Sequence, residues 1–337
     1  MKAALYESKE KIRIVDIPKP VPKAGEVLVK IKYTGICGSD LEAYKAGLYP
    51  SPVVMGHEAS GVIEELGPEV KRKKIGDRVA INSSMPCGNC YYCQTGYNNL
   101  CANGYSAFGI FQNGGFAEYT AVPAFSLVSI PDSIPDKFGT IFDQIGTCLL
   151  AIREGRFMMG NTAVIIGLGT IGQFLLQCLK LSGAGGVIVV EKNEHRLEVA
   201  KKFNPDVALS KINFGKMKGK LTNRLGAEFV FECTGRPEVI NATSSCVRRG
   251  GTIVQVGISD KPFEIDYLPF TMNHNRIQGV IGFLRKDFEY AVKLVAQKLI
   301  DPEPIVTKII SLDDIVEEGF QEAIKPDTKE LKIIVEP

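Results

Sequence analysis

A glycine-rich turn between an apolar run and a helical run constrains the fold of this chain most strongly. The stretch AVIIGLGTIG places Gly167, Gly169 and Gly172 in G-x-G-x-x-G spacing. The residues before the first glycine form a β-branched apolar run, and those after the third have helical periodicity. The first glycine permits a tight turn, the second lets the backbone approach a pyrophosphate, and the third allows close helix–strand packing. This order predicts a strand–turn–helix unit that binds a dinucleotide at the helix N-terminus.

The residues around this turn extend the prediction to a whole domain. Continuous apolar runs alternate with helical stretches between residues 150 and 285. Such runs are typical of strands that are buried on both faces of a parallel sheet covered by helices. The runs lie at residues 162–167, 186–191, 227–235, 251–257 and 276–282. We therefore expect a Rossmann-type, doubly wound α/β nucleotide-binding domain over residues 150–285.

The choice of dinucleotide is indicated by an acidic residue at the end of the second apolar run. Glu191 follows Gly172 by nineteen residues, which suits a carboxylate that accepts hydrogen bonds from the adenosine ribose. The same carboxylate would repel a 2′-phosphate, so NAD is favoured over NADP, although Arg196 leaves NADP open. The residues expected to contact the coenzyme are Gly167, Gly169, Thr170, Ile171, Gly172, Glu191, Arg196, Thr234, Val256 and Phe283.

The first part of the chain has a different sequence pattern. Short β-rich stretches at residues 27–36, 59–66, 77–82 and 116–122 are separated by glycine and proline. This pattern predicts a rolled or barrel-like β domain. The tail after residue 285 is too short for a domain of its own, so we expect it to return and complete the domain begun by residues 1–149, which then comprises 1–149 and 286–337.

Composition excludes several classes of function. The chain has 40 basic and 38 acidic residues, a net charge of +2, which argues against binding nucleic acid or a membrane surface through bulk charge. No apolar run approaches the ~18 residues of a membrane span, and the charged N-terminus lacks a signal-peptide core. We therefore expect a cytoplasmic protein whose nine cysteines are thiols or metal ligands.

Four of these cysteines are crowded into the lobe 86–104. Cys87, Cys90, Cys93 and Cys101 follow C-x2-C-x2-C-x7-C, a spacing at which four thiolates can close a tetrahedral zinc shell. Such a closed shell leaves no position for a substrate, so the zinc is expected to be structural. An iron–sulfur cluster and a redox dithiol are the alternatives.

A second candidate metal site lies upstream of that lobe. Cys37 stands in GICGSD, and His57 and Glu58 stand together in MGHEASG. A thiolate, an imidazole and a carboxylate can form an open zinc site with a position left for water or substrate. From the spacing alone, a buried cysteine and a satisfied core histidine explain these residues equally well.

Taken in order, GICGSD, GHEASG, the four-cysteine lobe, GGFAEY and GLGTIG resemble the zinc-containing medium-chain alcohol dehydrogenases over the whole chain. The resemblance is closest to the sorbitol, threonine and polyol dehydrogenase branch. It implies a GroES-like catalytic domain, a Rossmann domain and an active site in the cleft between them. It also implies hydride transfer from a secondary alcohol or polyol to NAD, with two zinc ions per subunit, in a homotetramer or homodimer.

The resemblance also implies roles for individual residues. Cys37, His57 and Asp143 match the ligands of the catalytic zinc, with Glu58 as a further ligand or an exchanging one. Asp143 is followed by Gln144, where relatives commonly have proline. Two residues match the proton relay: Ser39 the hydroxyl at the zinc, and Glu42 the position of a histidine in many relatives, where it is either a relay group or a surface acid.

Two other functions are carried as alternatives. One is a zinc-independent quinone or enoyl reductase of the same superfamily, and the other is a non-catalytic nucleotide-binding protein that retains the fold. The intact metal ligands disfavour both. The sequence does not separate a phosphorylated from a neutral polyol as the substrate.

Overall fold

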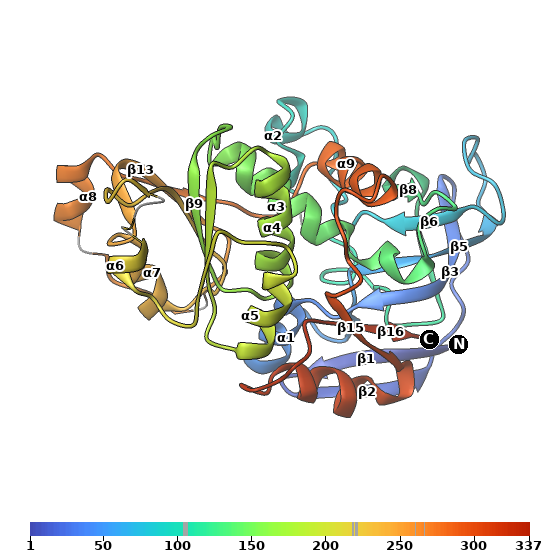
Figure 1. Ribbon diagram of the computed structural model, residues 1–337. Coiled ribbons are helices and arrows are strands. Elements are labelled where there is room, and N and C mark those ends of the chain that lie inside the picture. Colours follow the sequence, from blue (N-terminus) through green and yellow to red (C-terminus); the bar gives the residue numbers. More distant parts are fainter. Residues whose placement is uncertain (104–106, 218, 220–221, 260, 266) are drawn as a thin grey trace. The chain divides into compact units, whose positions relative to one another are not determined.

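The computed structural model describes residues 1–103, 107–217, 219, 222–259, 261–265 and 267–337. The chain divides into two compact units (Figure 1). Unit 1 comprises Met1–Asp143 and Phe283–Pro337, and unit 2 comprises Gln144–Gly282.

Unit 2 is built on a parallel sheet with the order β11-β10-β9-β12-β13-β14. All strand pairs of this sheet are parallel. The predicted apolar runs contribute five of these strands, and β9, β10 and β12 are almost wholly buried, as strands covered on both faces should be. Strand β11 was not predicted, and the edge strand β14 is mostly exposed. The strands are β9 (Thr162–Ile166), β10 (Gly186–Val190), β11 (Val207–Leu209), β12 (Ala227–Glu232), β13 (Val247–Gln255) and β14 (Arg276–Gly279).

Helices cover both faces of this sheet, with α4 and α5 on one side and α6 and α7 on the other (Figure 1). The strand order reverses between β9 and β12, which is the switch point where doubly wound folds bind ligands. The helices are α3 (Phe142–Glu154), which spans the unit boundary, α4 (Thr170–Leu181), α5 (Glu194–Lys201), α6 (Phe214–Met217), α7 (Pro237–Thr243) and α8 (Tyr267–Asn273).

The stretch PEVINATSSCVRR (237–249) has helical periodicity, but the helix that forms there is shorter. Pro237 does occupy the first turn of α7, but the helix ends at Thr243 and the chain enters β13 at Val247. Val247 pairs with Ala227 of β12, and both side chains are buried in one core cluster. Pairing with a distant strand therefore overrides the local helical pattern.

Unit 1 is rich in β-structure, as predicted. Its larger sheet has the order β15-β16-β3-β5-β6-β8, with β7 also paired to β3, and its smaller sheet has the order β2-β1-β4. The strands are β1 (Lys2–Ser8), β2 (Lys11–Asp16), β3 (Glu26–Gly35), β4 (Val53–Val54), β5 (Glu58–Leu66), β6 (Arg78–Ile81), β7 (Tyr119–Pro123), β8 (Leu127–Ser129), β15 (Val306–Ser311) and β16 (Lys332–Glu336).

The end of the chain is part of unit 1. Strand β16 pairs antiparallel with β3, where Ile334 faces Gly35. The helices of unit 1 are α1 (Gly38–Ala46), α2 (Tyr91–Gln94) and α9 (Arg285–Ala296). Short 3₁₀ turns lie at Asn98–Leu100, Ala124–Ser126, Asp136–Thr140 and Leu312–Asp314, and a π-helix lies at Ile315–Gln321.

No helix in the described ranges has both the length and the apolar character that crossing a membrane requires.

Candidate active site

Two neighbouring strand ends bring three metal-ligand side chains together in unit 1. Strand β3 ends at Gly35, two residues before Cys37, and Gly35 pairs with Glu58 at the start of β5. His57 immediately precedes Glu58. As a result, one ligand atom from each of Cys37, His57 and Glu58 lies within 4.8 Å of the others.

Two glycines make this close approach possible. A Cβ atom on Gly35 would lie 2.2 Å from Oε2 of Glu58, and one on Gly56 would lie 2.8 Å from the Phe116 ring. Gly56 also has a φ of +96°, a conformation that side-chain-bearing residues rarely adopt. Glycine at these two positions leaves the space that the carboxylate and the histidine segment occupy.

The Asp40 carboxylate lies next to the imidazole ring of His57. It lies in the first turn of α1, where Oδ2 accepts a hydrogen bond from the Cys37 amide at 3.0 Å. Its other oxygen, Oδ1, lies 3.3 Å from Nδ1 of His57. A carboxylate at one ring nitrogen directs the other toward a metal. Burial lowers the pKa of His57, but the negative charges of Asp40 and Cys37 outweigh that effect and raise it.

Glu58 is held by a buried lysine. Nζ of Lys332 lies 2.6 Å from Oε2 of Glu58 and donates to the Ile36 carbonyl at 2.9 Å. The two charged side chains are only 2% and 1% exposed. Burial lowers the pKa of Lys332, but the charge of Glu58 more than offsets this, so the pKa is raised.

Asp143 stands beside this group, although it is not one of the three residues whose ligand atoms converge within 4.8 Å. Its Oδ2 accepts a hydrogen bond from the Ser83 hydroxyl at 2.9 Å. Burial raises its pKa to about 7, while the nearby charge of His57 lowers it and that of Glu58 raises it. The site contains more acidic groups than basic ones. Lys332 faces the thiol of Cys37 and the buried carboxyls of Asp40, Glu58 and Asp143. This excess of acidic donor groups fits a divalent cation.

Besides Ser83, Ser39 and Tyr49 supply hydroxyl groups near this site. The Tyr49 hydroxyl is buried and, within the described ranges, makes no hydrogen bond of normal geometry. Burial and the charges of Asp40 and Cys37 raise the pKa of Tyr49, while the Ser39 hydroxyl and His57 lower it, so the phenol stays neutral. Glu42 is half-exposed and directs its carboxylate to Lys45 at 3.2 Å. Tyr49 belongs to none of the motifs of the sequence, so sequence patterns alone did not indicate it.

The four cysteines of the lobe 86–104 also come together. Sγ of Cys90 lies 3.5 Å from Sγ of Cys93 and 3.9 Å from that of Cys101, and the Cys87 and Cys93 sulfurs lie 4.0 Å apart. These separations exceed a disulfide bond of ~2.05 Å. They match the edges of ~3.8 Å in a tetrahedron with Zn–S bonds of ~2.3 Å. Backbone amides of Cys93 and Ala102 lower the pKa of Cys90 to about 6, which favours the thiolate that binds metal.

The glycine motif of unit 2 adopts the predicted strand–turn–helix geometry between β9 and α4. Gly167 has a φ of +94°. A Cβ atom on Gly172 would lie 2.0 Å from the Gly167 carbonyl oxygen, whereas one on Gly169 would meet nothing within 4 Å. Gly169 caps α4 without a side-chain hydrogen bond. The second glycine therefore borders space at the positive end of the helix dipole, where a pyrophosphate fits.

Two of the other predicted coenzyme residues, Glu191 and Thr234, lie next to the glycine motif. Glu191 is buried, and its carboxylate accepts hydrogen bonds from the Leu168 amide at 2.7 Å and the Asn193 amide at 2.8 Å. The Thr234 methyl lies beside Gly167.

The remaining coenzyme candidates lie on three other segments. Thr170 and Ile171 open α4. Nε of Arg196 is buried without a hydrogen bond in the described structure. Val256 follows β13. Phe283 is buried in unit 1, where its ring lies 5.6 Å from that of Phe288.

Comparison with known proteins agrees with this chemistry. Residues 23–132 match the family model of the alcohol dehydrogenase GroES-like domain, and residues 170–297 match that of zinc-binding dehydrogenases. An L-threonine 3-dehydrogenase of Shewanella baltica is 34% identical over 330 residues, which cover 95% of each chain.

Solved structures give the same result. A 2R,3R-butanediol dehydrogenase of Bacillus subtilis is 30% identical, with a TM-score of 0.90 over 100% of this chain and 99% of that one. An Escherichia coli alcohol dehydrogenase in complex with NADH is 27% identical, with a TM-score of 0.92 over 100% and 99%.

The fold and the site together define a zinc-dependent oxidoreductase that uses a nicotinamide coenzyme. The chain belongs to the zinc-containing medium-chain alcohol dehydrogenases, in the branch of the threonine and polyol dehydrogenases. Neither the zinc-independent reductase nor the non-catalytic alternative receives better support from these matches.

Proposed function

We propose that this chain oxidises a secondary alcohol or polyol that carries a second hydroxyl group, with NAD as the acceptor. The observation that supports this most directly is the convergence of Cys37, His57 and Glu58 within 4.8 Å. In this proposal, Cys37 and His57 hold zinc together with Asp143 or Glu58. Bound zinc supplies a Lewis acid that lowers the pKa of the substrate hydroxyl, and bound NAD supplies the hydride acceptor.

The protein's own residues prepare the site for this chemistry. Asp40 fixes the orientation of the His57 ring through their 3.3 Å contact. Lys332 holds the Glu58 carboxylate by its 2.6 Å ion pair, which favours Asp143 as the third ligand and Glu58 as an exchanging one. The relay begins at Ser39, whose hydroxyl takes the proton of the substrate hydroxyl and passes it toward solvent. Glu42 stays outside this relay because it pairs with Lys45 at the surface.

Tyr49 determines the substrate class in this proposal. Within the described residues the buried Tyr49 hydroxyl lies near Ser39 but makes no hydrogen bond of normal geometry. A poorly satisfied buried hydroxyl is costly, and a second hydroxyl on the substrate can satisfy it. Sites built to hydrogen-bond a substrate hydroxyl discriminate strongly against analogues that lack it. A vicinal diol, a sugar alcohol or a hydroxy amino acid such as threonine meets this requirement, whereas a simple secondary alcohol does not.

The test is NADH formation, followed by absorbance, with 2,3-butanediol, sorbitol, threonine and 2-butanol as substrates of zinc-loaded enzyme. We expect turnover with at least one of the first three and much weaker turnover with 2-butanol. Cys37→Ser should abolish turnover but leave NADH binding unchanged, because the coenzyme motif lies in unit 2. If none of the four compounds is oxidised, the proposed reaction is wrong.

The proposal also includes the setting of the enzyme. Residues 1–149 with 286–337 form the catalytic domain and residues 150–285 bind NAD. The molecule is a cytoplasmic homotetramer or homodimer. Light scattering on the eluting peak of a size-exclusion column tests the oligomeric state.

A further inference from the structure

A second pocket lies in unit 1, and none of the residues assigned to the reaction lines it. Its volume is about 720 Å³, within the range of ~300–1,000 Å³ that suits small organic ligands. Among the described residues that line it, one carboxylate, that of Glu69, stands against four cationic side chains: Lys71, Arg72, Lys73 and Arg285. The chain as a whole is nearly neutral, so this excess of positive charge is local.

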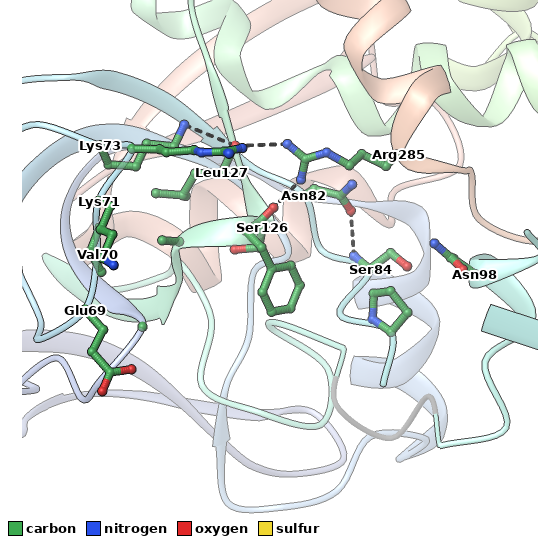
Figure 2. A pocket seen from close by; sticks show the side chains of 15 residues that line it. Glu69, Val70, Lys71, Lys73, Asn82, Ser84, Asn98, Ser126, Leu127 and Arg285 are labelled. Atoms are coloured by element: carbon green, nitrogen blue, oxygen red, sulfur yellow. Dashed lines mark hydrogen bonds between the residues drawn. The ribbon is translucent and has the colours of Figure 1, made fainter. Parts of the chain in front are cut away.

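Two of these cations are held side by side over one carbonyl oxygen (Figure 2). Nζ of Lys73 donates to the Leu127 carbonyl at 3.3 Å, and Nη2 of Arg285 donates to the same oxygen at 3.4 Å. Arg285 also donates to the Phe125 carbonyl. Backbone carbonyls carry only partial charge, so these contacts position the cations without neutralising them.

The charge around Lys73 is incompletely balanced. Burial lowers the pKa of Lys73, the charge of Asp77 partly opposes this effect, and the neighbouring charge of Arg285 lowers the pKa further. Arg285 has a partial counter-ion in Glu289, whose Oε1 lies 2.9 Å from Nε. An anion between the two cations would relieve their repulsion and make charge-assisted hydrogen bonds with both.

The walls of the pocket indicate what this anion is attached to. Val70, Pro86, Phe125 and Leu127 supply apolar surface beside the cations. The Phe125 side chain is 57% exposed, so its ring is accessible to a ligand. An exposed ring next to positive charge suits a ligand with a flat ring and a phosphate, since such rings stack on aromatic side chains.

We propose that this pocket is a second, non-catalytic site that binds a phosphorylated small molecule, with the phosphoryl group at Lys73 and Arg285 and a ring against Phe125. It is separate from the coenzyme site, because the glycine motif belongs to unit 2. The proposal does not depend on the identity of the substrate.

The test is calorimetric titration of zinc-loaded protein, saturated with NADH so that the coenzyme site is filled. The probes are inorganic phosphate and AMP, in a buffer free of other oxyanions. We expect binding that weakens with salt. Tighter binding of AMP than of phosphate supports a ring-bearing phosphate ester as the ligand, and equal binding would contradict the proposed contact of the ring with Phe125.

Four variants make the test specific. Lys73→Met and the double variant Lys71→Glu/Arg72→Glu should weaken binding of both probes about tenfold or more, from the loss of charge-assisted contacts. Phe125→Ala should weaken the binding of AMP and leave the binding of phosphate unchanged. Lys74→Met is the matched control, because Lys74 lies in the same turn but does not line the pocket.

The double variant changes two exposed side chains, so it keeps the test valid if Lys73→Met destabilises the fold, which melting curves would reveal. The proposal is wrong if neither probe binds the wild-type protein, or if the double variant binds both probes as tightly as Lys74→Met does.

Discussion

Replacing Lys332 by methionine tests the electrostatic balance of the proposed zinc site. Lys332 is 2% exposed, and its Nζ lies 2.6 Å from Oε2 of Glu58, which is 1% exposed. Methionine fills a similar volume but removes the charge and the hydrogen bond to the Ile36 carbonyl. In the metal-free protein the change leaves the Glu58 charge buried without its cation.

The size of the effect follows from this burial. Breaking a buried ion pair by removing one partner costs about 3–5 kcal/mol, since the remaining charge keeps its desolvation penalty. For a domain of this size class, ~1 kcal/mol lowers the melting temperature by ~2–4 °C. Metal-free Lys332→Met should therefore melt roughly 6–20 °C below the wild-type protein. Zinc should narrow this gap, because a divalent cation offsets the charge of Glu58.

The assay is thermal unfolding followed by circular dichroism, with and without zinc. Lys2→Met is the matched control, because the Lys2–Asp313 pair is 52% and 58% exposed and such pairs contribute only ~0–1 kcal/mol. The double variant Lys332→Met/Glu58→Met should recover most of the loss, since it leaves no unpaired charge. If metal-free Lys332→Met melts within 2 °C of metal-free Lys2→Met, then the Lys332–Glu58 ion pair does not stabilise the protein as reasoned here.

The other predictions concern substrate, coenzyme, metal and pH. Tyr49→Phe should lower kcat/KM for a vicinal diol about ten- to a hundredfold and leave a simple secondary alcohol unaffected; equal losses on both would contradict the assigned role. Gly172→Ala puts a methyl group 2.0 Å from a carbonyl oxygen, so NADH binding, followed by fluorescence, should fall at least about tenfold, and unchanged binding would show that the turn tolerates a side chain. Cys90→Ser should remove the zinc of the cysteine lobe, measured by atomic emission, and full retention of metal would refute a four-sulfur shell. Burial raises the pKa of Glu228, but hydrogen bonds from Thr162 outweigh it and the pKa lies below its ordinary value of 4.5. The stability that this carboxylate adds is thus complete above pH 4.5 and lost as the pH falls through its lowered pKa; melting temperature against pH should fall less steeply in Glu228→Gln, and identical curves would count against the argument.

Much of the fold could be predicted because its signals are local. The glycine motif, the apolar runs of the parallel sheet and the closely spaced cysteines each act over a few residues, and local geometry then fixes their arrangement. Cys37 and His57 could also be singled out by motif, because glycines next to them mark places where the backbone must approach its neighbours.

The contacts that tune the sites were beyond the sequence. Lys332 and Glu58 are 274 positions apart, and nothing in LKIIVEP distinguishes a buried lysine from a surface one. Tyr49 lies in a short connecting segment whose path is set by the strands around it. The basic pocket joins Leu127 to Arg285, which are 158 positions apart.

The sequence by itself determined the two kinds of domain, the coenzyme turn and the residue types able to bind metal, because backbone conformation and ligand chemistry are encoded in short stretches. Only the tertiary structure decided which charges are buried together and which buried hydroxyl, within the described part of the chain, makes no hydrogen bond of normal geometry. Side chains become buried and close to one another when distant strands pair. This environment determines the energies of the buried charges and hydroxyls far more strongly than the residues next to them in the sequence do.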